Sequence, residues 1–470
     1  MSRPLIGRTV RRLRQEKGIS QQALAARLGI SASYLNLIEH DQRSVTAALL
    51  IKLGETLEVD LGVLSGVQER DREGRLREAL TDPLLGAEAV SEADIAALAA
   101  IPQASQAVLA LYRALRVARE DASGIALPSG RRIMLPNEEA RDVFHERNNH
   151  FPALEAAAEA LSDAMSSEGS SLAPAERNHA IAERLRQRHG LVVRVAPLQG
   201  ALRSYDPEAR LLILSEQLPR ESRGFHLAFQ LMLLEARDTV ETAVAQIAPS
   251  SPEAAGLIRI GLLNYSAGCL LMPYRPYLAA AQALRHDVDV LAARFCVSFE
   301  QACHRLSTLQ RPSERGIPFF FLRTDPAGNI TKRFSAAGFP FLQHGGSCAR
   351  WVPHTAFTTP GAMRVQVAQL PDGATFLCFA RTVAGPATGW GDPPPIRAVT
   401  LGCDVSHATE LVYADGLDVA RGVTGIGLAC RLCERADCRS RAFPPLEHRL
   451  ALDPYMKGNS PYRFEPRPRP

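Results

Sequence analysis

Three cysteines near the C-terminal end of the sequence restrict the fold of this chain more than any other feature. Cys430, Cys433 and Cys438 are separated by two and four residues, a spacing that lets three thiolates meet at one centre. Thiolates prefer soft metals, so zinc or an iron–sulfur cluster is the natural occupant. Buried cysteines without a metal are the alternative, because cysteine is often a core residue. The Arg, Glu and Asp side chains between them suit a core poorly, and the segment therefore predicts a metal centre.

A metal centre of this kind needs a fourth ligand. Cys403 is the nearest upstream cysteine, and we expect it to complete the set. Cys348, which follows two glycines and a serine, is the alternative fourth ligand. Three arginines surround the cysteine segment, and we expect them to be solvated or to meet phosphate groups: Arg431, Arg435 and Arg441.

Length and charge suggest several domains and a basic N-terminus. A chain of 470 residues is long enough for about three domains. Residues 1–52 hold nine Lys or Arg and three Asp or Glu, so their net charge is +6. Because the whole chain has a net charge of +4, the remaining residues have a net charge of −2. Basic character confined to one end suggests nucleic acid as its partner.

The sequence also favours a reducing, cytoplasmic compartment. The first residues contain no apolar run, so no signal peptide is expected. The apolar stretch 256–273 is interrupted by Arg259 and Asn264 and falls short of a membrane span. Nine cysteines without a secretion signal point to metal ligation more than to disulfides.

Residues 5–60 have the pattern of a small helical bundle. Ser20 and Ser31 each precede a short helical segment, at 21–30 and 32–39, as helix-capping hydroxyl residues do. Gly29 suits the end of the first segment, and a further helix is expected at about 46–57. Two short helices joined in this way form a helix-turn-helix, whose second helix enters the major groove of DNA.

This segment resembles the helix-turn-helix family of phage repressors and their bacterial relatives. The resemblance is carried by Ser20-Gln21, Leu24-Ala25, Leu28 to Ser31, Ser33 to Leu35 and Ile38-Glu39. It implies that the second helix faces the groove and that Gln21 and Arg43 contact phosphate or sugar. The implied DNA-binding residues are Gln21, Ser31, Ala32, Ser33, Asn36, Leu37 and Arg43. A helical bundle with a solvated basic face is the alternative.

Residues 66–165 are expected to connect this head to the rest of the chain. A polar, charge-rich join covers 66–92, and helical patterns follow at 91–100 and 105–119. Asn137 is expected to cap one long amphipathic segment that continues to about Met165. A long helical connector is a natural dimer surface, and a simple spacer would show the same pattern.

Residues 166–310 have the pattern of a helical domain with a pair of short strands at 191–195 and 210–214. Helices are expected at 175–189, 223–235, 252–272, 276–285 and 287–310. Cys296 and Cys303 would lie on the last of these as core residues.

The segment from Phe225 to Glu235 is similar to the zinc-peptidase helix that follows such DNA heads in bacteria, where the site reads His-Glu-x-x-His. Here Phe229 and Leu233 stand at the two metal positions and Gln230 at the position of the base. A phenyl ring and a leucine cannot bind zinc, and an amide cannot take a proton from water. The resemblance therefore implies the fold without the protease, and His226 is expected to be a core or surface histidine.

From Ile317 the apolar pattern alternates with a period of two. Strands are expected at 318–323, 330–334, 364–369, 375–382 and 398–401. The first two flank Asp325-Pro326-Ala327-Gly328-Asn329, a hairpin turn signal. We expect a sheet that carries Cys348, Cys378 and Cys403, with the cysteine loop closing over it.

Over nearly its full length the chain resembles the short-chain fatty acyl-coenzyme A regulators, which control propionate and acetate metabolism in bacteria. Besides the head, the resemblance is carried by Phe225 to Leu231, Gly402 to Ala408 and Cys430 to Pro445. The family implies an acyl-coenzyme A effector in the C-terminal half and a cysteine-bound 4Fe–4S cluster beside it. The spacing alone leaves zinc as the alternative.

The sequence as a whole predicts an α+β multidomain protein that is not an enzyme. Its expected parts are a helix-turn-helix head at 1–65, a helical linker and dimerisation region at 66–165, a degenerate peptidase-like domain at 166–310 and a β-rich effector domain with the cysteine centre at 311–460. The expected function is transcription regulation by a cytoplasmic homodimer that binds a near-palindromic operator and a short-chain acyl-coenzyme A. A DNA-binding protein with a purely structural zinc module and a metallopeptidase-type regulator are the alternatives.

Overall fold

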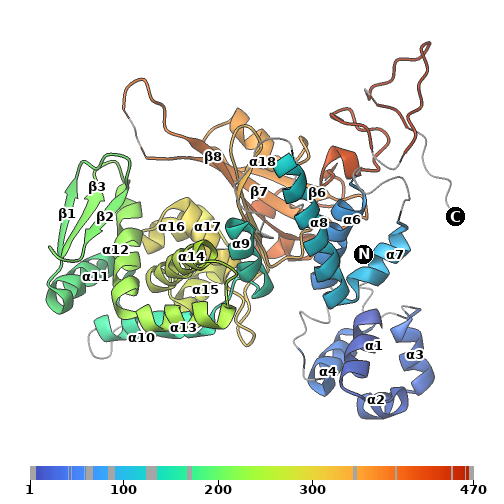
Figure 1. Ribbon diagram of the computed structural model, residues 1–470, viewed down its shortest axis with the longest axis horizontal. Helices are drawn as coiled ribbons and strands as arrows, with labels where there is room; N and C mark the ends of the chain where they lie inside the picture. Colours follow the sequence, from blue (N-terminus) through green and yellow to red (C-terminus); the bar gives the residue numbers. More distant parts are fainter. Residues whose placement is uncertain are drawn as a thin grey trace.

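The computed structural model describes most of the chain: residues 7–40, 42–43, 45–57, 59, 67–82, 90–122, 135–166, 172–341, 347–386, 389–445, 448–460 and 462–464. Figure 1 shows a small helical head below a helical linker, a large helical region on the far side, and a sheet between the linker and that region. This is the expected α+β arrangement of parts.

The head consists of short helices whose ends follow local chemistry. They are α1 (Gly7–Glu16), α2 (Gln21–Leu28), α3 (Ala32–Glu39) and α4 (Ala47–Leu57). Ser20 caps α2 and Ser31 caps α3 by accepting a backbone N–H from the first turn, as predicted. Gly29 ends α2 with φ +70°, a conformation that glycine adopts without strain. The apolar faces meet in one core of Val10, Leu24, Leu28, Leu35 and Leu53.

The described part of the linker region begins with the helices α6 (Val67–Leu80), α7 (Glu92–Ala99), α8 (Pro102–Ala122) and α9 (Pro136–Glu146). The prediction of a polar join at 66–92 was wrong for its first part, because α6 buries Leu76 and Ala79 and pairs its charges with neighbouring helices. The single long helix predicted from Asn137 to Met165 was also wrong. Asn148 and Asn149 adopt positive φ, so the chain turns there between α9 and α10 (Pro152–Met165).

The helical domain packs around one long buried helix, α14 (Pro252–Leu271). Its other helices are α11 (Pro174–His189), α12 (Arg220–Glu235), α13 (Arg237–Ile247), α15 (Tyr274–Ala283), α16 (Val288–Phe295) and α17 (Phe299–Ser307). A small sheet of order β1-β3-β2 joins β1 (Val192–Ala196), β2 (Arg203–Asp206) and β3 (Leu211–Ser215). The strands β1 and β3 were expected; β2 and α13 were not.

The helix predicted at 287–310 is divided in two. Cys296 has φ +54° and ends α16, and Ser298 then starts α17 with a capping box. Cys303 is buried as expected, whereas Cys296 is only half-buried at the break.

The C-terminal sheet has the order β5-β4-β8-β7-β6-β9, and its two faces pack against different parts of the protein. The strands are β4 (Phe320–Thr324), β5 (Ile330–Ser335), β6 (Arg364–Gln369), β7 (Thr375–Ala384), β8 (Ile396–Asp404) and β9 (Val423–Gly425). One face, with Phe321 and Leu401, joins the core of the helical domain. The other face, with Phe320 and Ala398, packs on a separate aromatic core that includes Trp351. Short helices follow the strands: α18 (Val352–Thr355), η2 (Ala356–Thr358), η3 (Val405–Glu410), η4 (Val412–Ala414) and η5 (Cys430–Leu432).

Among the described helices, α14 alone is long and apolar enough by itself to cross a membrane, and 56% of its apolar window is buried in the protein. The bent pair formed by α7 and the first part of α8 passes the same test only if both count as one segment. The burial of α14 identifies it as a core helix.

Candidate functional site

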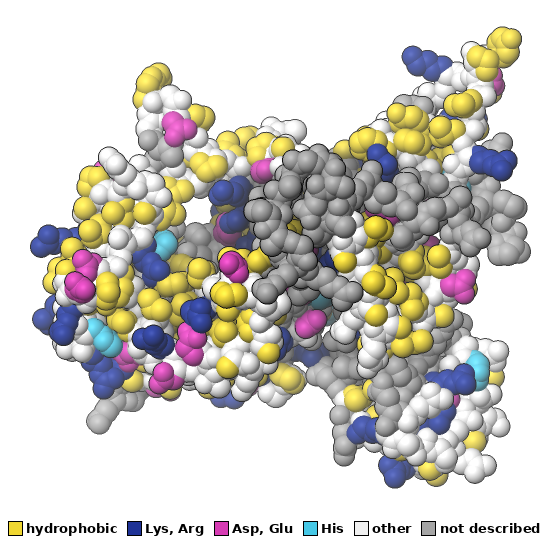
Figure 2. Space-filling model, viewed as in Figure 1, with side chains coloured by type: hydrophobic (Ala, Val, Ile, Leu, Met, Phe, Trp, Pro, Cys, Tyr) yellow, Lys and Arg dark blue, Asp and Glu magenta, His cyan; other side chains and the backbone are white. Residues whose placement is uncertain are grey.

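The head presents the predicted DNA-contacting side chains of α3 on one surface. Ser33 and Asn36 are exposed, and Ala32 and Leu37 are half-buried beside them. Arg43 is exposed after the helix. Figure 2 shows several Lys and Arg side chains on the visible face of this lobe. The helix therefore has a polar face available to the major groove, as a recognition helix requires.

A buried ion pair fixes this helix in the head. Arg14 donates to both carboxylate oxygens of Glu39, at 2.6 and 3.0 Å, and Glu39 is 2% exposed. Gln21 donates from Nε2 to Glu39 (3.1 Å) and to Asn36 (3.2 Å). Gln21 thus orients Asn36, a role that the sequence did not predict, while Ser31 acts as the helix cap.

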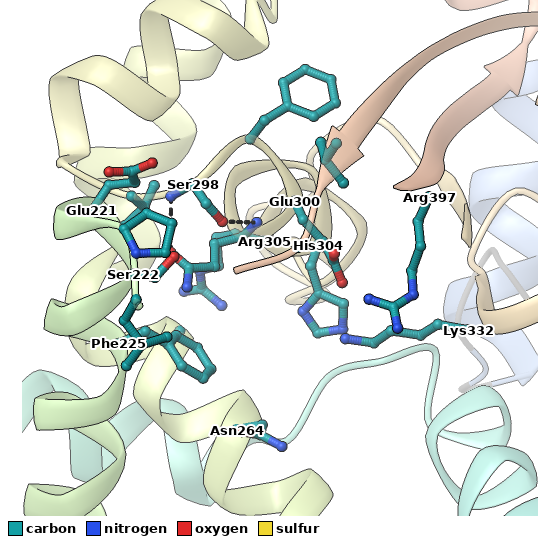
Figure 3. A pocket seen from close by; sticks show the side chains of 18 of the residues that line it. Glu221, Ser222, Phe225, Asn264, Ser298, Glu300, His304, Arg305, Lys332 and Arg397 are labelled. Carbon is teal, nitrogen blue, oxygen red and sulfur yellow. Dashed lines mark hydrogen bonds between the residues drawn. The ribbon is translucent and has the colours of Figure 1, made fainter. Parts of the chain in front are cut away.

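A cavity of about 790 Å³ lies between the helical domain and the C-terminal sheet. Its walls come from α12, α14 and α17 on one side and from β5 and the β7–β8 hairpin on the other. Figure 3 shows Phe225 and Asn264 on one side of this space and Lys332 and Arg397 on the other, with His304 between them. Apolar groups form much of the lining: Leu202, Leu218, Phe225, Met272, Phe299 and Val383.

Two cations in this cavity lack a direct ion pair. The side chains of Lys332 and Arg397 make no hydrogen bond and no ion pair with the described residues. The Lys332 ammonium lies 5.4 Å from the ring centroid of Phe334, and burial lowers the pKa of this lysine to about 8 although Glu300 opposes the shift. A desolvated cation without a counter-ion gains most from an anionic ligand, so the cavity is suited to phosphate groups.

A third cation of the lining, Arg305, is already paired. It donates to both oxygens of Glu155, at 2.7 and 2.9 Å, and both side chains are almost fully buried. Tyr265 donates to the same carboxylate at 2.7 Å. Burial opposes ionisation of Glu155, but the charge of Arg305 lowers the pKa of this carboxyl below its usual range. Because Arg305 is neutralised by Glu155, the charge of an anionic ligand would be bound by Lys332 and Arg397 instead.

The peptidase-like helix α12 forms one wall of the cavity without a metal site. Phe229 is buried, and the guanidinium carbon of Arg203 lies 3.9 Å from its ring centroid. Arg203 also donates to Gln230 at 3.4 Å, and Gln230 is fully buried. Burial and the charge of Arg203 lower the pKa of His226, which lines the cavity, to about 4, so this histidine is neutral near pH 7.

The cysteine loop is held by arginines that bond to backbone carbonyls. Arg441 is 3% exposed and donates to the carbonyls of Cys430 (2.8 Å) and Cys433 (2.7 Å). Arg435 donates to the carbonyls of Ile426, Gln369 and Leu370. The expectation of solvated or phosphate-binding arginines was therefore wrong for these two; Arg431 is exposed. Arg441, which is buried, and Arg435, which is half-buried, fix the loop backbone on the sheet.

Of the predicted metal ligands, the structure brings Cys430, Cys433 and Cys438 into one loop but leaves Cys403 apart. Cys403 lies on β8 opposite Leu377 and faces the core of the helical domain. The loop packs on the other face of the sheet through Ile426 and Leu428. The sheet therefore separates Cys403 from the loop, which argues against Cys403 as the fourth ligand.

Cys348 has the position that was expected of Cys403. It belongs to the same aromatic core as Ile426 and lies within electrostatic reach of Cys433, whose pKa is raised chiefly by burial. Its neighbours Gly345 and Gly346 lie outside the described residues. A Cβ on Gly427 would lie 2.7 Å from the Cys433 sulfur, so only glycine leaves room there.

The donor chemistry thus fits a soft metal, but the described side chains are not assembled into a site. No group of three or more His, Cys, Asp or Glu side chains in the described part of the chain is close enough to hold a metal ion. The thiols share one face of the sheet, and the backbone contacts of Arg441 determine the loop that carries three of them.

The cavity cations are functional candidates that the sequence did not reveal. Lys332 comes from β5 and Arg397 from β8, which are not adjacent, and both face the cavity with α12 and α17. No local motif contains them; the only signal was a charged residue within an apolar strand pattern.

Comparison with known proteins assigns families to three parts of the chain. Residues 10–64 match a helix-turn-helix family, residues 186–307 match the IrrE N-terminal-like domain, and residues 308–462 match the short-chain fatty acyl coenzyme A regulator C-terminal domain. A solved structure titled as a Mycobacterium tuberculosis transcriptional regulator aligns with a TM-score of 0.66 and 42% identity, over 70% of this chain and 99% of that one.

Curated relatives cover the chain from end to end. The HTH-type transcriptional regulator PrpR of Mycobacterium tuberculosis is 41% identical over 98% of this chain and 96% of its own length. RamB from the same species is 40% identical over 98% of this chain and 99% of its own length. The propionyl-CoA carboxylase regulator of Cereibacter sphaeroides is 39% identical over 97% of this chain and 98% of its own length. The chain therefore belongs to the short-chain fatty acyl coenzyme A regulator family, and it is a helix-turn-helix transcriptional regulator rather than an enzyme.

Proposed function

We propose that this regulator binds a near-palindromic operator through its head and that a short-chain acyl-coenzyme A in the cavity controls the binding. The observation that carries the proposal is the pair of cations without an ion pair, Lys332 and Arg397, in a cavity of about 790 Å³ whose lining is partly apolar and partly polar. A coenzyme A thioester has phosphates for these cations and an acyl chain for apolar walls. The names of the relatives, one of them a propionyl-CoA carboxylase regulator, favour genes of propionate or acetate metabolism as targets.

Calorimetric titration of the full-length protein with propionyl-, acetyl- and butyryl-coenzyme A tests this effector. Arg397→Met should weaken binding by about 10- to 100-fold, because a charged hydrogen bond contributes about 1.5–3 kcal/mol. Arg421→Met is the matched control, because its side chain is 92% exposed and it does not line the cavity. Equal affinities in the two variants would contradict the placement of the ligand, and no binding to the wild type would contradict the effector class.

We further propose that Cys430, Cys433 and Cys438 hold an iron–sulfur cluster together with Cys348, which replaces Cys403 in the predicted set. Support comes from the shared sheet face and from the electrostatic proximity of Cys348 to Cys433. Such a cluster would add a redox-sensitive cross-link between two loops. Zinc is the alternative occupant and would make the loop a purely structural module; visible absorbance and iron analysis of the purified protein distinguish them.

A homodimer is the proposed assembly, because a single small head buries too little DNA surface for tight specific binding. Leu111 and Leu115 lie one turn apart on α8 and are 64% and 40% exposed, so a second copy has an apolar surface to cover there. Leu111→Glu should produce a monomer in sedimentation experiments, and a wild type that sediments as a monomer would contradict the assembly. The cytoplasm is the compartment that this DNA-binding role implies.

A further inference from the structure

The helix α6 is the next described helix after the head, and it lies directly against the C-terminal domain (Figure 1). Leu76 and Ala79 are fully buried. At Gly74 the contact is close: a Cβ there would lie 2.9 Å from the Cβ of Pro340. A movement of Pro340 towards α6 would therefore displace the helix, because the helix backbone and the proline ring are already closely packed.

The strand β5 connects the cavity to α6 through two consecutive residues. Lys332 pairs with Arg323 and lines the cavity. Arg333 pairs with Leu322, so it points to the opposite face of the sheet, where it is 7% exposed. Asp71 and Arg75 of α6 lie within electrostatic reach of its guanidinium. A ligand that shifts the backbone at Lys332 would also shift Arg333, because the two residues are consecutive on the same short strand.

Arg333 belongs to a set of charges that we name the linker cluster: Asp71 and Arg75 on α6, Arg113 on α8, Asp142 and His145 on α9, and Arg333 on β5. Arg75 binds Asp71 at 2.9 Å and Asp142 at 3.4 Å, and Arg113 binds Asp142 at 3.2 Å. Asp71 is buried, and burial opposes its ionisation, yet its cationic neighbours lower its pKa to about 2. The cluster therefore joins three linker helices to the sheet by charge.

The other end of α6 meets the cysteine loop. Arg77 lines a pocket of about 240 Å³ together with Arg431, Cys433 and His448. Its guanidinium is held by Glu92 of α7 at 2.5 Å. The helix α6 thus lies within electrostatic reach of β5 through the linker cluster, packs closely on Pro340 at Gly74, and shares a pocket with the cysteine loop at Arg77.

We propose that α6 is the common output of two inputs, so that effector in the cavity and the state of the cysteine loop both act on the head by displacing this one helix. The proposal rests on the proposed function for the identity of the effector. The linker cluster provides the coupling on the cavity side, because buried charges change energy steeply with separation. Two sites coupled through one such element typically alter each other's ligand affinity by about 5- to 150-fold.

Gly74→Ala tests the link between α6 and the head without any effector. The added methyl must displace α6 from Pro340, so operator affinity of the full-length protein should change by at least about 5-fold. Gly256→Ala on α14 is the matched control, because nothing lies within 4 Å of its Cβ position, and it should leave operator affinity unchanged. Equal operator affinity in the two variants would overturn the proposal whatever the effector proves to be.

Arg333→Met tests the input from the cavity. This variant should bind propionyl-coenzyme A as the wild type does, since Arg333 does not line the cavity, but the ligand should no longer change operator affinity. Hydrogen exchange of α6 amides should respond to propionyl-coenzyme A in the wild type and not in the variant. Asp71→Asn removes the charge on α6 and should reproduce the loss if Arg333→Met folds poorly. Retained responses in both variants would overturn the proposal, whereas absence of ligand binding by the wild type would refute only the effector assignment.

Discussion

The guanidinium of Arg203 covers the ring of Phe229, with 3.9 Å between the guanidinium carbon and the ring centroid. The peptidase-like helix thus has a fixed cation, bonded also to Gln230, beside the positions where related sites hold zinc. Burial without an anionic partner lowers the pKa of Arg203, but an arginine remains charged near neutral pH. The positive charge of Arg203 would repel a metal cation at this position, so α12 serves as a structural wall of the cavity.

Proteolysis is therefore not expected. Purified protein with added zinc should cleave neither itself nor casein, because Phe229, Gln230 and Leu233 supply no metal ligand and no base. The measurement is gel electrophoresis over hours with and without a chelator. Chelator-sensitive cleavage that persists in Gln230→Ala would contradict the interpretation of this helix.

DNA binding should depend on Arg43 through the phosphate backbone. Arg43→Ala should weaken binding to specific and nonspecific duplexes alike, and the slope of log affinity against log salt should fall by about 0.9. Arg188→Ala is a suitable control, because this side chain is 65% exposed on α11 outside the head. Asn36→Ala should instead reduce the preference for the operator, because Asn36 lies on the exposed face of α3. An unchanged salt slope in Arg43→Ala would show that this arginine does not contact phosphate.

Local chemistry made part of the fold predictable. Ser31 and Gly29 mark helix ends with side-chain and backbone requirements that few other residues meet, and α3 began and ended where expected. Asn149 and Cys296 end or redirect helices with positive φ and carry only a weak sequence signal, so two predicted helices were too long.

The metal site and the cavity were less predictable, because both depend on the pairing register of the strands and on contacts between residues far apart in the sequence. Cys403 and Cys378 are both buried strand cysteines, and only the pairing of β7 with β8 shows that they face opposite sides of the sheet. Lys332 and Arg397 meet only because the sheet order places β5 and β8 on either side of β4. No spacing in the sequence contains that information.

Removal of single thiols should separate the two candidates for the fourth metal ligand. Cys348→Ser, Cys430→Ser, Cys433→Ser and Cys438→Ser should each lose bound metal, because a site left one ligand short usually loses its ion. Cys403→Ser should keep the metal, since Cys403 lies on the other face of the sheet. Elemental analysis of anaerobically purified variants is the measurement. Metal loss in Cys403→Ser with retention in Cys348→Ser would restore the original assignment.

The buried pair of Arg305 and Glu155 should be essential for stability. Glu155→Gln leaves Arg305 buried without its counter-ion, and we expect a loss of about 3–5 kcal/mol in the free energy of unfolding. Glu183→Gln is the control, because its partner Arg186 is 66% exposed and exposed ion pairs contribute little to stability. Denaturant unfolding of both variants measures the difference. Equal stability would show that solvent or another anion compensates Arg305.

Effector binding should be coupled to protonation of Lys332. Burial lowers the pKa of this lysine to about 8, and a polyanion beside it would raise that pKa again. At a pH between the pKa of Lys332 in the free protein and its higher pKa in the complex, Lys332 is protonated in the complex but largely deprotonated in the free protein. Affinity for propionyl-coenzyme A should therefore be highest below pH 8 and fall as pH rises above it, by up to about 10-fold per unit.

Calorimetry in buffers of different ionisation enthalpy, from pH 7 to pH 9.5, should accordingly detect proton uptake on binding near pH 8.5, which lies within this window. Lys332→Met should bind more weakly at pH 7 and lose the pH dependence, because the titrating group is gone. Arg397→Met should also bind more weakly but keep the dependence, since an arginine does not titrate in this range. The same pH profile in Lys332→Met and the wild type would show that another group takes up the proton and that Lys332 does not contact the ligand.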